Sequence, residues 1–166
     1  MLVPLSKLEY FDKPYFGEKV ETRFKDALDD MREAGNCFAL NRWTGVVHHC
    51  MAIVQVGMVE LGKDLEAPLD EYLHDWNDMQ THLGKAIEAK RTAILGGSKS
   101  KASAAEKSQW NRLEPFYSEV LSDVGAMKKA WRNPGFHFRL PPFDEDKAKK
   151  VLDRVREFMT NLADNI

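Results

Sequence analysis

The sequence predicts an all-α fold, an antiparallel bundle of four to five amphipathic helices. Five segments carry apolar residues at helical spacing, and none carries a sustained alternation with a period of two. Breaks that contain Gly, Pro or Asn separate these segments. The chain has 166 residues, 43% of them hydrophobic, which is enough to bury a core without disulfides or a structural metal. We therefore expect a single domain over residues 1–166.

The chain opens with an aromatic segment that precedes the first helical pattern. Residues 1–16 contain Tyr10, Phe11, Tyr15 and Phe16, so we expect an N-terminal arm that packs over the bundle or over a partner. The first helix is expected from about Gly17 to Ala34, where apolar residues recur every three or four positions. Gly35–Asn36 should end this helix, because glycine tolerates the left-handed conformation that follows a helix end.

Two further helices are expected in the middle of the chain. The second, from about Cys37 to Leu65, carries a wide apolar stripe typical of the central helix of a bundle. Its longest apolar stretch, Val46 to Leu61, is interrupted by polar residues, and we expect it to be too short and too polar to span a membrane. A break at Ala67–Pro68 follows, and the third helix is expected from about Leu69 to Leu95.

The last third of the chain predicts a loop and two more helices. Residues 96–105 are small and basic, which favours a flexible loop. The next helix carries a heptad-like seam that ends at Trp131, and it should begin or kink at Pro115. The final helix should begin after Asp144, whose carboxylate is suited to capping the first turn.

Charge and cysteine content limit the classes of partner and compartment. The formal net charge is −2, so bulk charge does not attract nucleic acid, and RNA binding would need a local basic patch. Cys37 and Cys50 lie in apolar surroundings without a CxxC spacing, and the N-terminus lacks the core of a signal peptide. We expect buried, unreactive thiols, a cytoplasmic protein and no association with a membrane.

Most routes to an enzyme find no support in the sequence. His74, Asp78 and His82 share one face of the third helix, but that face is polar, and a solvated surface is the favoured interpretation. His48 and His49 are adjacent and point about 100° apart, so they cannot chelate one ion together. Phosphate-loop and nucleophile motifs are also absent from the sequence, and we expect no metal and no cofactor.

The remaining candidate site is the run from Trp131 to His137. Arg132 lies in the last turn of the seam helix, and the proline that follows Asn133 keeps that residue out of the α-region. Pro134–Gly135 can then turn the chain so that His137 approaches the helix end. A guanidinium, an amide and an imidazole in one small volume suit phosphodiester chemistry, because Arg binds phosphate oxygens and His transfers protons near neutral pH.

This run, followed by an acidic turn and a final amphipathic helix, resembles the HEPN superfamily, and in particular an uncharacterised bacterial branch with a Trp-Arg-Asn-Pro-x-x-His motif. The central helix resembles that branch as well. The resemblance implies a homodimer whose two motifs meet in one cleft, and a metal-independent endoribonuclease of the toxin or defence type. It implies catalytic roles on RNA for Arg132, Asn133 and His137.

Alternatives to catalysis remain open. Arg42 and the histidine pair His48–His49 satisfy the same Arg-to-His spacing. Members of the branch that this chain resembles often carry an acidic and a basic residue where this chain has Gln55 and Val59. A cation in the last turn of a helix is also favourable by itself. The same bundle is therefore compatible with a non-catalytic interaction or scaffold module, such as an antitoxin-like partner of another protein.

Overall fold

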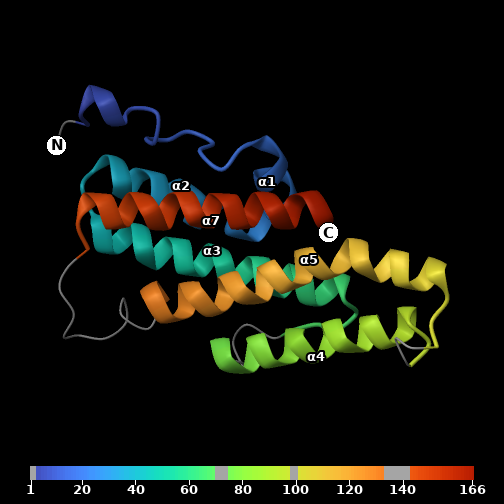
Figure 1. The fold of residues 1–166 in the computed structure, drawn as a ribbon. Coiled ribbons are helices and arrows are strands. Elements are labelled where there is room, and N and C mark those ends of the chain that lie inside the picture. Colours follow the sequence, from blue (N-terminus) through green and yellow to red (C-terminus); the bar gives the residue numbers. More distant parts are fainter. Residues whose placement is uncertain (1–2, 70–74, 98–100, 133–142) are drawn as a thin grey trace.

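The computed structural model describes residues 3–69, 75–97, 101–132 and 143–166, and within these ranges the regular secondary structure is helical, without a strand (Figure 1). This confirms the all-α class. The α-helices are α1 (Glu18–Arg23), α2 (Leu28–Ala39), α3 (Trp43–Asp64), α4 (Trp76–Ile94), α5 (Ala104–Met127) and α7 (Glu145–Asn165). Two 3-10 turns and a π-helical turn accompany them, η1 (Leu5–Lys7), η2 (Lys25–Ala27) and η3 (Lys128–Arg132).

Helix α3 lies at the centre of the arrangement. Helices α2 and α7 pack along it, and α4 and α5 form a hairpin that lies on its other side (Figure 1). By length and composition alone α3 would be able to cross a membrane, which differs from our expectation for this stretch. More than half of its apolar window, 56%, is buried inside the bundle, and this supports the interpretation of α3 as a core helix.

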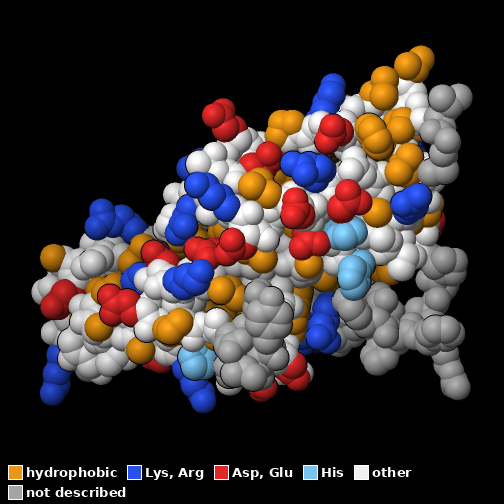
Figure 2. Space-filling model, turned by 180° about the vertical axis from the view of Figure 1, so that it is seen from behind, with side chains coloured by type: hydrophobic (Ala, Val, Ile, Leu, Met, Phe, Trp, Pro, Cys, Tyr) orange, Lys and Arg blue, Asp and Glu red, His pale blue; other side chains and the backbone are white. Residues whose placement is uncertain are grey.

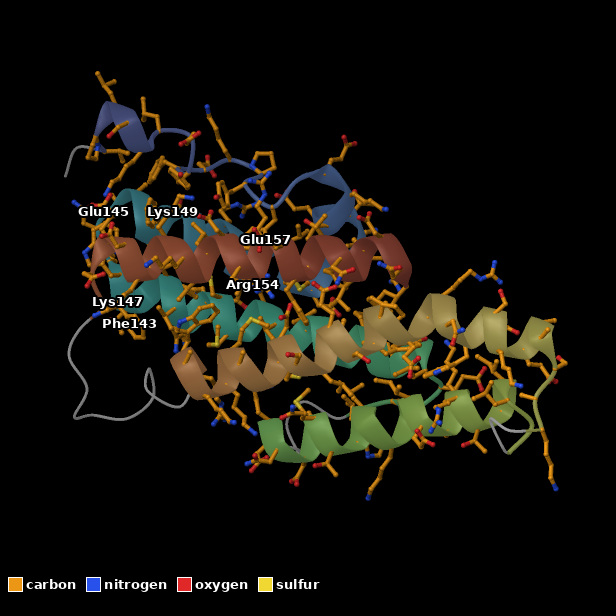
Figure 3. All side chains as sticks on the ribbon, in the orientation of Figure 1. Phe143, Glu145, Lys147, Lys149, Arg154 and Glu157 are labelled. Carbon is orange, nitrogen blue, oxygen red and sulfur yellow. The ribbon has the colours of Figure 1, made fainter. Side chains whose placement is uncertain are left out.

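The final helix, α7, begins where the sequence pattern predicts, directly after Asp144. The carboxylate of Asp144 accepts a hydrogen bond from the backbone N–H of Lys147, as expected of an N-cap. Arg154, labelled on α7 in Figure 3, pairs with Asp123 of α5 at 2.5 Å and with Glu157 of its own helix at 3.1 Å. The opposite stripe of α7 is buried and faces the core: Ala148, Val151, Leu152, Val155, Phe158, Met159 and Leu162.

The predicted boundary between the first two helices is wrong. The first segment is divided, with a break at Phe24, and α2 continues through Gly35–Asn36 to Ala39. Gly35 does not end the helix. It leaves room for the N-terminal arm, because a Cβ at this position would lie 2.5 Å from the carbonyl oxygen of Tyr10. The left-handed residue after α2 is Asn41 (φ 57°), which begins the short turn into α3.

The N-terminal arm packs over the bundle, which is one of the two positions expected for it from the sequence. Tyr10 is buried, with its ring centroid 4.7 Å from that of Phe38 on α2, and Phe16 is also buried. Leu5, Leu8 and Phe11 remain exposed, and Figure 2 shows apolar side chains along this edge of the molecule.

The starts of α4 and α5 also differ from expectation. Leu69 lies outside any helix, residues 70–74 fall outside the described ranges, and α4 begins at Trp76. Helix α5 begins well before Pro115, because Ser103 and Glu106 form a capping box, and Pro115 is accommodated inside the helix. The expected loop at 96–105 therefore ends at Ser103.

Candidate functional site

The π-helical turn η3 ends α5 and carries Arg132 at its last position. Arg132 is half-buried, and its guanidinium carbon lies 5.9 Å from the centroid of a Trp76 ring, within the range of a cation–π contact. Trp76 is the first residue of α4 and is almost completely buried. The first turn of α4 therefore provides an aromatic surface for the cation at the end of α5.

Trp76 connects this cation to the central helix. Its indole N–H donates a hydrogen bond of 3.1 Å to Oε1 of Gln55 on α3. Residues of α3 and α4 thus meet beside Arg132 at the end of α5.

Asp75 adds a negative charge next to the guanidinium. Its carboxylate caps α4 by accepting hydrogen bonds from the backbone N–H groups of Asn77 and Asp78. The N–H of Asp78, then that of Asn77, lowers the pKa of Asp75 below its usual value, and the charge of Arg132 lowers it further. Asp75 is therefore ionised at neutral pH and attracts Arg132.

A second cation lies on the same turn. Lys128 Nζ donates hydrogen bonds to Oδ1 of Asn77 at 2.6 Å and to Oε1 of Gln80 at 3.3 Å. Lys128 and Arg132 thus both contact the N-terminal half of α4 from η3. The turn η3 carries three basic residues, Lys128, Lys129 and Arg132, in a chain whose net charge is negative.

Of the three predicted site residues, Arg132 lies in the described part of the chain. Asn133 and His137 lie outside the described residues, so the approach of His137 to the helix end stays a prediction. Trp131 is half-buried and packs against the core, in agreement with its position on the seam. The face of the third helix that carries His74, Asp78 and His82 was predicted to be a solvated surface. Asp78 and His82 are exposed, which supports this prediction, and His74 falls outside the described ranges.

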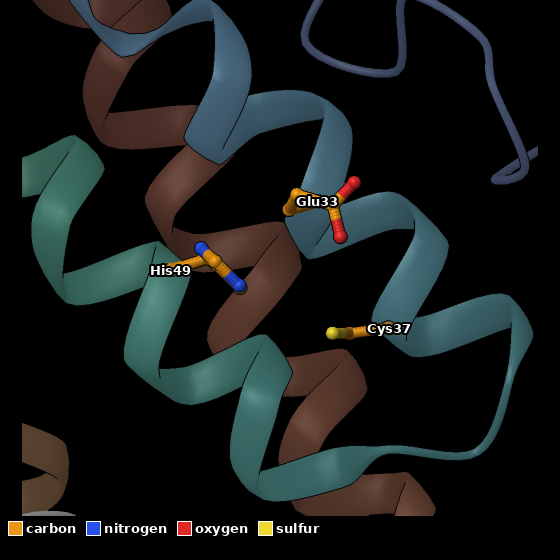
Figure 4. Close-up of side chains that lie close together, drawn as sticks. All are labelled: Glu33, Cys37 and His49. Atoms are coloured by element: carbon orange, nitrogen blue, oxygen red, sulfur yellow. The ribbon is translucent and has the colours of Figure 1, made fainter.

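The structure also brings together a group that sequence reasoning missed. Ligand atoms of Glu33, Cys37 and His49 all lie within 4.8 Å of one another (Figure 4). The sequence pattern predicts Cys37 and His49 on one helix, more than three turns apart. The sequence feature that could have revealed the group is Asn41, where the chain turns between two helices. A helix boundary at this residue places Cys37 and His49 on adjacent helices.

Compared with known proteins, the chain matches no family model, no curated protein sequence and no solved structure. Its function must therefore be argued from its own residues and from the resemblance of the Trp131–His137 run.

Proposed function

We propose that this protein is a metal-independent endoribonuclease of the HEPN type, active as a homodimer with a composite site. The observation that carries the proposal is the π-helical turn η3, which holds Arg132 half-buried beside Trp76 and Asp75 directly before the Asn-Pro-x-x-His run. Single π-helical turns are rare and occur frequently at functional sites, because they reorient side chains at the expense of hydrogen-bond geometry.

The environment of Arg132 suits recognition of a phosphodiester. A guanidinium on an aromatic face is partly desolvated, so its attraction for an anion is stronger than it would be in bulk water. The cation–π contact is worth about 0.5–2 kcal/mol, which a charge-assisted pair of hydrogen bonds to phosphate can replace. Lys128, four residues earlier, adds positive charge along the approach.

The proposed reaction needs no metal. The imidazole of His137 takes the proton from a ribose 2′-hydroxyl, and that oxygen attacks the adjacent phosphorus. Arg132 stabilises the charge that develops on the phosphate oxygens, and Asn133 orients the phosphate or the imidazole of the second protomer. The bond to the 5′-oxygen breaks, and that oxygen takes up the proton that the imidazole had accepted, which leaves a 2′,3′-cyclic phosphate, a 5′-hydroxyl and a neutral imidazole.

A cleavage assay tests the proposal. A mixed pool of RNA is incubated in excess EDTA with the wild type, Arg132→Ala, His137→Ala and the control Arg112→Ala, which removes an exposed cation from the same helix. We expect cleavage by the wild type and the control, and a loss of at least about 100-fold in the other two variants. Intact RNA with a folded, dimeric wild type, or equal cleavage by all four proteins, would contradict the proposal.

One observation favours a second candidate, a non-catalytic interaction module built on the same bundle. Arg132 and Lys128 both contact α4, and these contacts tie the end of α5 to its neighbour without any reaction. Thermal unfolding separates the two candidates. Arg132→Ala and His137→Ala variants with strongly lowered melting temperatures would favour the module, and variants with wild-type stability but no cleavage would favour the nuclease.

A further inference from the structure

Helices α2 and α3 bring a thiol, an imidazole and a carboxylate to one place on the surface of the bundle. The ligand atoms of Cys37, His49 and Glu33 lie within 4.8 Å of one another, and in Figure 4 the side chains of Cys37 and His49 extend from their helices toward each other. We propose that these three residues bind a divalent zinc-class metal ion through Cys37 Sγ, His49 Nε2 and a carboxylate oxygen of Glu33.

The faces of the two helices explain why the group forms. Asp30, Glu33 and Cys37 are spaced by three and four residues, so they lie along one face of α2. Gly45 and His49 are four residues apart and share the face of α3 that meets it. The turn at residues 40–42 joins these helices directly, and this sets the register in which the two faces oppose each other.

Gly45 provides the space that the sulfur atom occupies. A Cβ at this position would lie 2.8 Å from Cys37 Sγ, closer than two such atoms can approach. Any side chain on Gly45 would therefore displace the thiol. The absence of a side chain there is therefore required for the thiol to take its present position.

Asp30 lies where it would hold the imidazole in the tautomer that a metal requires. An oxygen of its carboxylate lies 2.7 Å from His49 Nδ1. With the proton on Nδ1, the ring donates to Asp30 and presents the lone pair of Nε2 to an ion. A carboxylate that accepts from the outer nitrogen of a metal-binding histidine is a recurrent feature of metal sites, because it fixes the tautomer and the orientation of the ring.

The exposure of the group suits an ion that reaches it from solvent. Cys37 is buried, the His49 side chain is 27% exposed, and Glu33 is exposed. Figure 2 shows histidine side chains beside acidic side chains on this face of the molecule. Three protein ligands leave a fourth tetrahedral position for water, as in open zinc sites.

The spacing of the ligand atoms needs only a small adjustment. Ligands around a tetrahedral zinc ion, with bonds of ~2.0–2.3 Å, lie ~3.3–3.8 Å apart, so the three atoms would move together by about 1 Å. The Glu33 carboxylate, which accepts a hydrogen bond from Asn36 at 3.1 Å, lies on an exposed and adjustable side chain. A thiolate with an imidazole selects zinc or cobalt over magnesium or calcium, which prefer oxygen ligands.

Binding has a defined proton balance. Burial, and then the charge of Glu33, raises the pKa of the Cys37 thiol, so the thiol is protonated at neutral pH. When the ion binds, the sulfur–metal bond replaces the S–H bond and the proton passes to solvent. The ion then connects α2 to α3 and stabilises the folded state relative to the unfolded chain.

Cobalt(II) provides a direct probe, because a thiolate–cobalt bond absorbs in the near ultraviolet and tetrahedral cobalt absorbs in the visible. The reduced, metal-free protein is titrated with Co²⁺ and then with Zn²⁺. We expect one ion per chain, both absorptions, their loss when zinc displaces cobalt, and a higher melting temperature. Cys37→Ser should lose the thiolate band, and His49→Gln and Glu33→Gln should weaken binding. Asp30→Asn should weaken it roughly 10–100-fold.

His48→Gln is the matched control, because His48 is the exposed neighbour of His49 on the same helix. This variant should bind cobalt as the wild type does. A folded wild type without a thiolate band would overturn the proposal, as would a Cys37→Ser variant that keeps the band or a His48→Gln variant that loses it. Glu33→Gln, at an exposed position, keeps the test valid if a Cys37 variant fails to fold. RNA cleavage is measured in EDTA, so each proposal can fail without the other.

Discussion

The Glu33–Cys37–His49 cluster and the surroundings of Arg132 are held in place by different parts of the chain. In the cluster, two helices joined by a short turn oppose each other closely enough that a Cβ on Gly45 would clash with the Cys37 sulfur. Arg132, in contrast, owes its position to side chains of neighbouring helices. Its guanidinium lies over Trp76, and Trp76 in turn donates a hydrogen bond to Gln55.

This difference affects what each region can do. Residues on packed, regular helices keep their relative positions for as long as the helices stay packed, so the three side chains of the cluster already lie near one another without an ion. A cation–π contact of about 0.5–2 kcal/mol is weak enough to be exchanged for a ligand. Loss of the contact with Trp76 alone would therefore cost Arg132 little free energy, whereas the positions of the cluster residues depend on the packing of two helices.

The largest expected effect is that of Trp76→Ala on stability. This substitution removes a nearly completely buried ring that supports Arg132 and contacts Gln55. We expect the free energy of unfolding to fall by about 3–5 kcal/mol, as for other buried Trp or Phe residues replaced by Ala. Urea denaturation followed by circular dichroism measures the change. A loss below about 1 kcal/mol would mean that Trp76 does not anchor this region.

Gly45→Ala tests the close approach in the cluster. The added Cβ would meet the Cys37 sulfur at 2.8 Å, and we expect a loss of about 1–3 kcal/mol in unfolding free energy. The Cβ of Cys37 is 3.5 Å away, an ordinary contact, so the same substitution in a Cys37→Ala background should be neutral or stabilising. Alanine exceeds glycine in helix propensity by about 1 kcal/mol, which favours that reversal. Equal effects in the two backgrounds would argue against a sulfur clash.

Trp76→Phe separates the ring from its hydrogen bond. Phenylalanine keeps an aromatic face for Arg132 but cannot donate to Gln55 Oε1. We expect a loss of about 1 kcal/mol in unfolding free energy, typical of one hydrogen bond, and RNA cleavage close to that of the wild type. The measurement is the urea midpoint of Trp76→Phe beside that of Gln55→Ala. If Trp76→Phe abolishes cleavage while the protein stays folded, the indole N–H has a role in the site that the geometry does not assign to it.

The sequence predicts features that depend on residues close together in the chain. The cap at Asp144, the buried stripe of α7 and the helical class all follow from local patterns, and all are confirmed. The boundary at Gly35 was wrong because that glycine serves a contact with Tyr10, which lies 25 positions away in the chain. Helix propensity cannot distinguish a glycine that ends a helix from a glycine that lies inside a helix and lets another part of the backbone pack closely against it.

The candidate sites also differ in whether their residues are close together in the chain. Arg132, Asn133 and His137 form a contiguous run, so the sequence can indicate them, although Trp76 and Gln55 beside Arg132 come from two other helices. The cluster depends on the register between α2 and α3, which the turn at Asn41 sets. Because the predicted boundary between α2 and α3 was wrong by a few residues, the sequence did not predict the Glu33–Cys37–His49 cluster.

Asp75→Asn should have the smallest effect and a specific dependence on pH. Asparagine caps a helix about as well as aspartate, so the substitution isolates the charge beside Arg132. The pKa of Asp75 is lowered in the folded protein, so its ionised form stabilises the fold above the unfolded value of about 3.9. That contribution is lost as the pH falls through the folded pKa.

The difference in urea midpoint between wild type and Asp75→Asn should therefore be present at pH 7 and disappear in acid. It should be smaller than the shift caused by Trp76→Phe, because Asp75 is exposed and its charge is screened by salt. Most of the stabilisation comes from the N–H groups of Asp78 and Asn77, so an Arg132→Ala background should reduce the difference only in part. A difference that stays constant from pH 7 to acid would show that the charge of Asp75 does not contribute to holding Arg132.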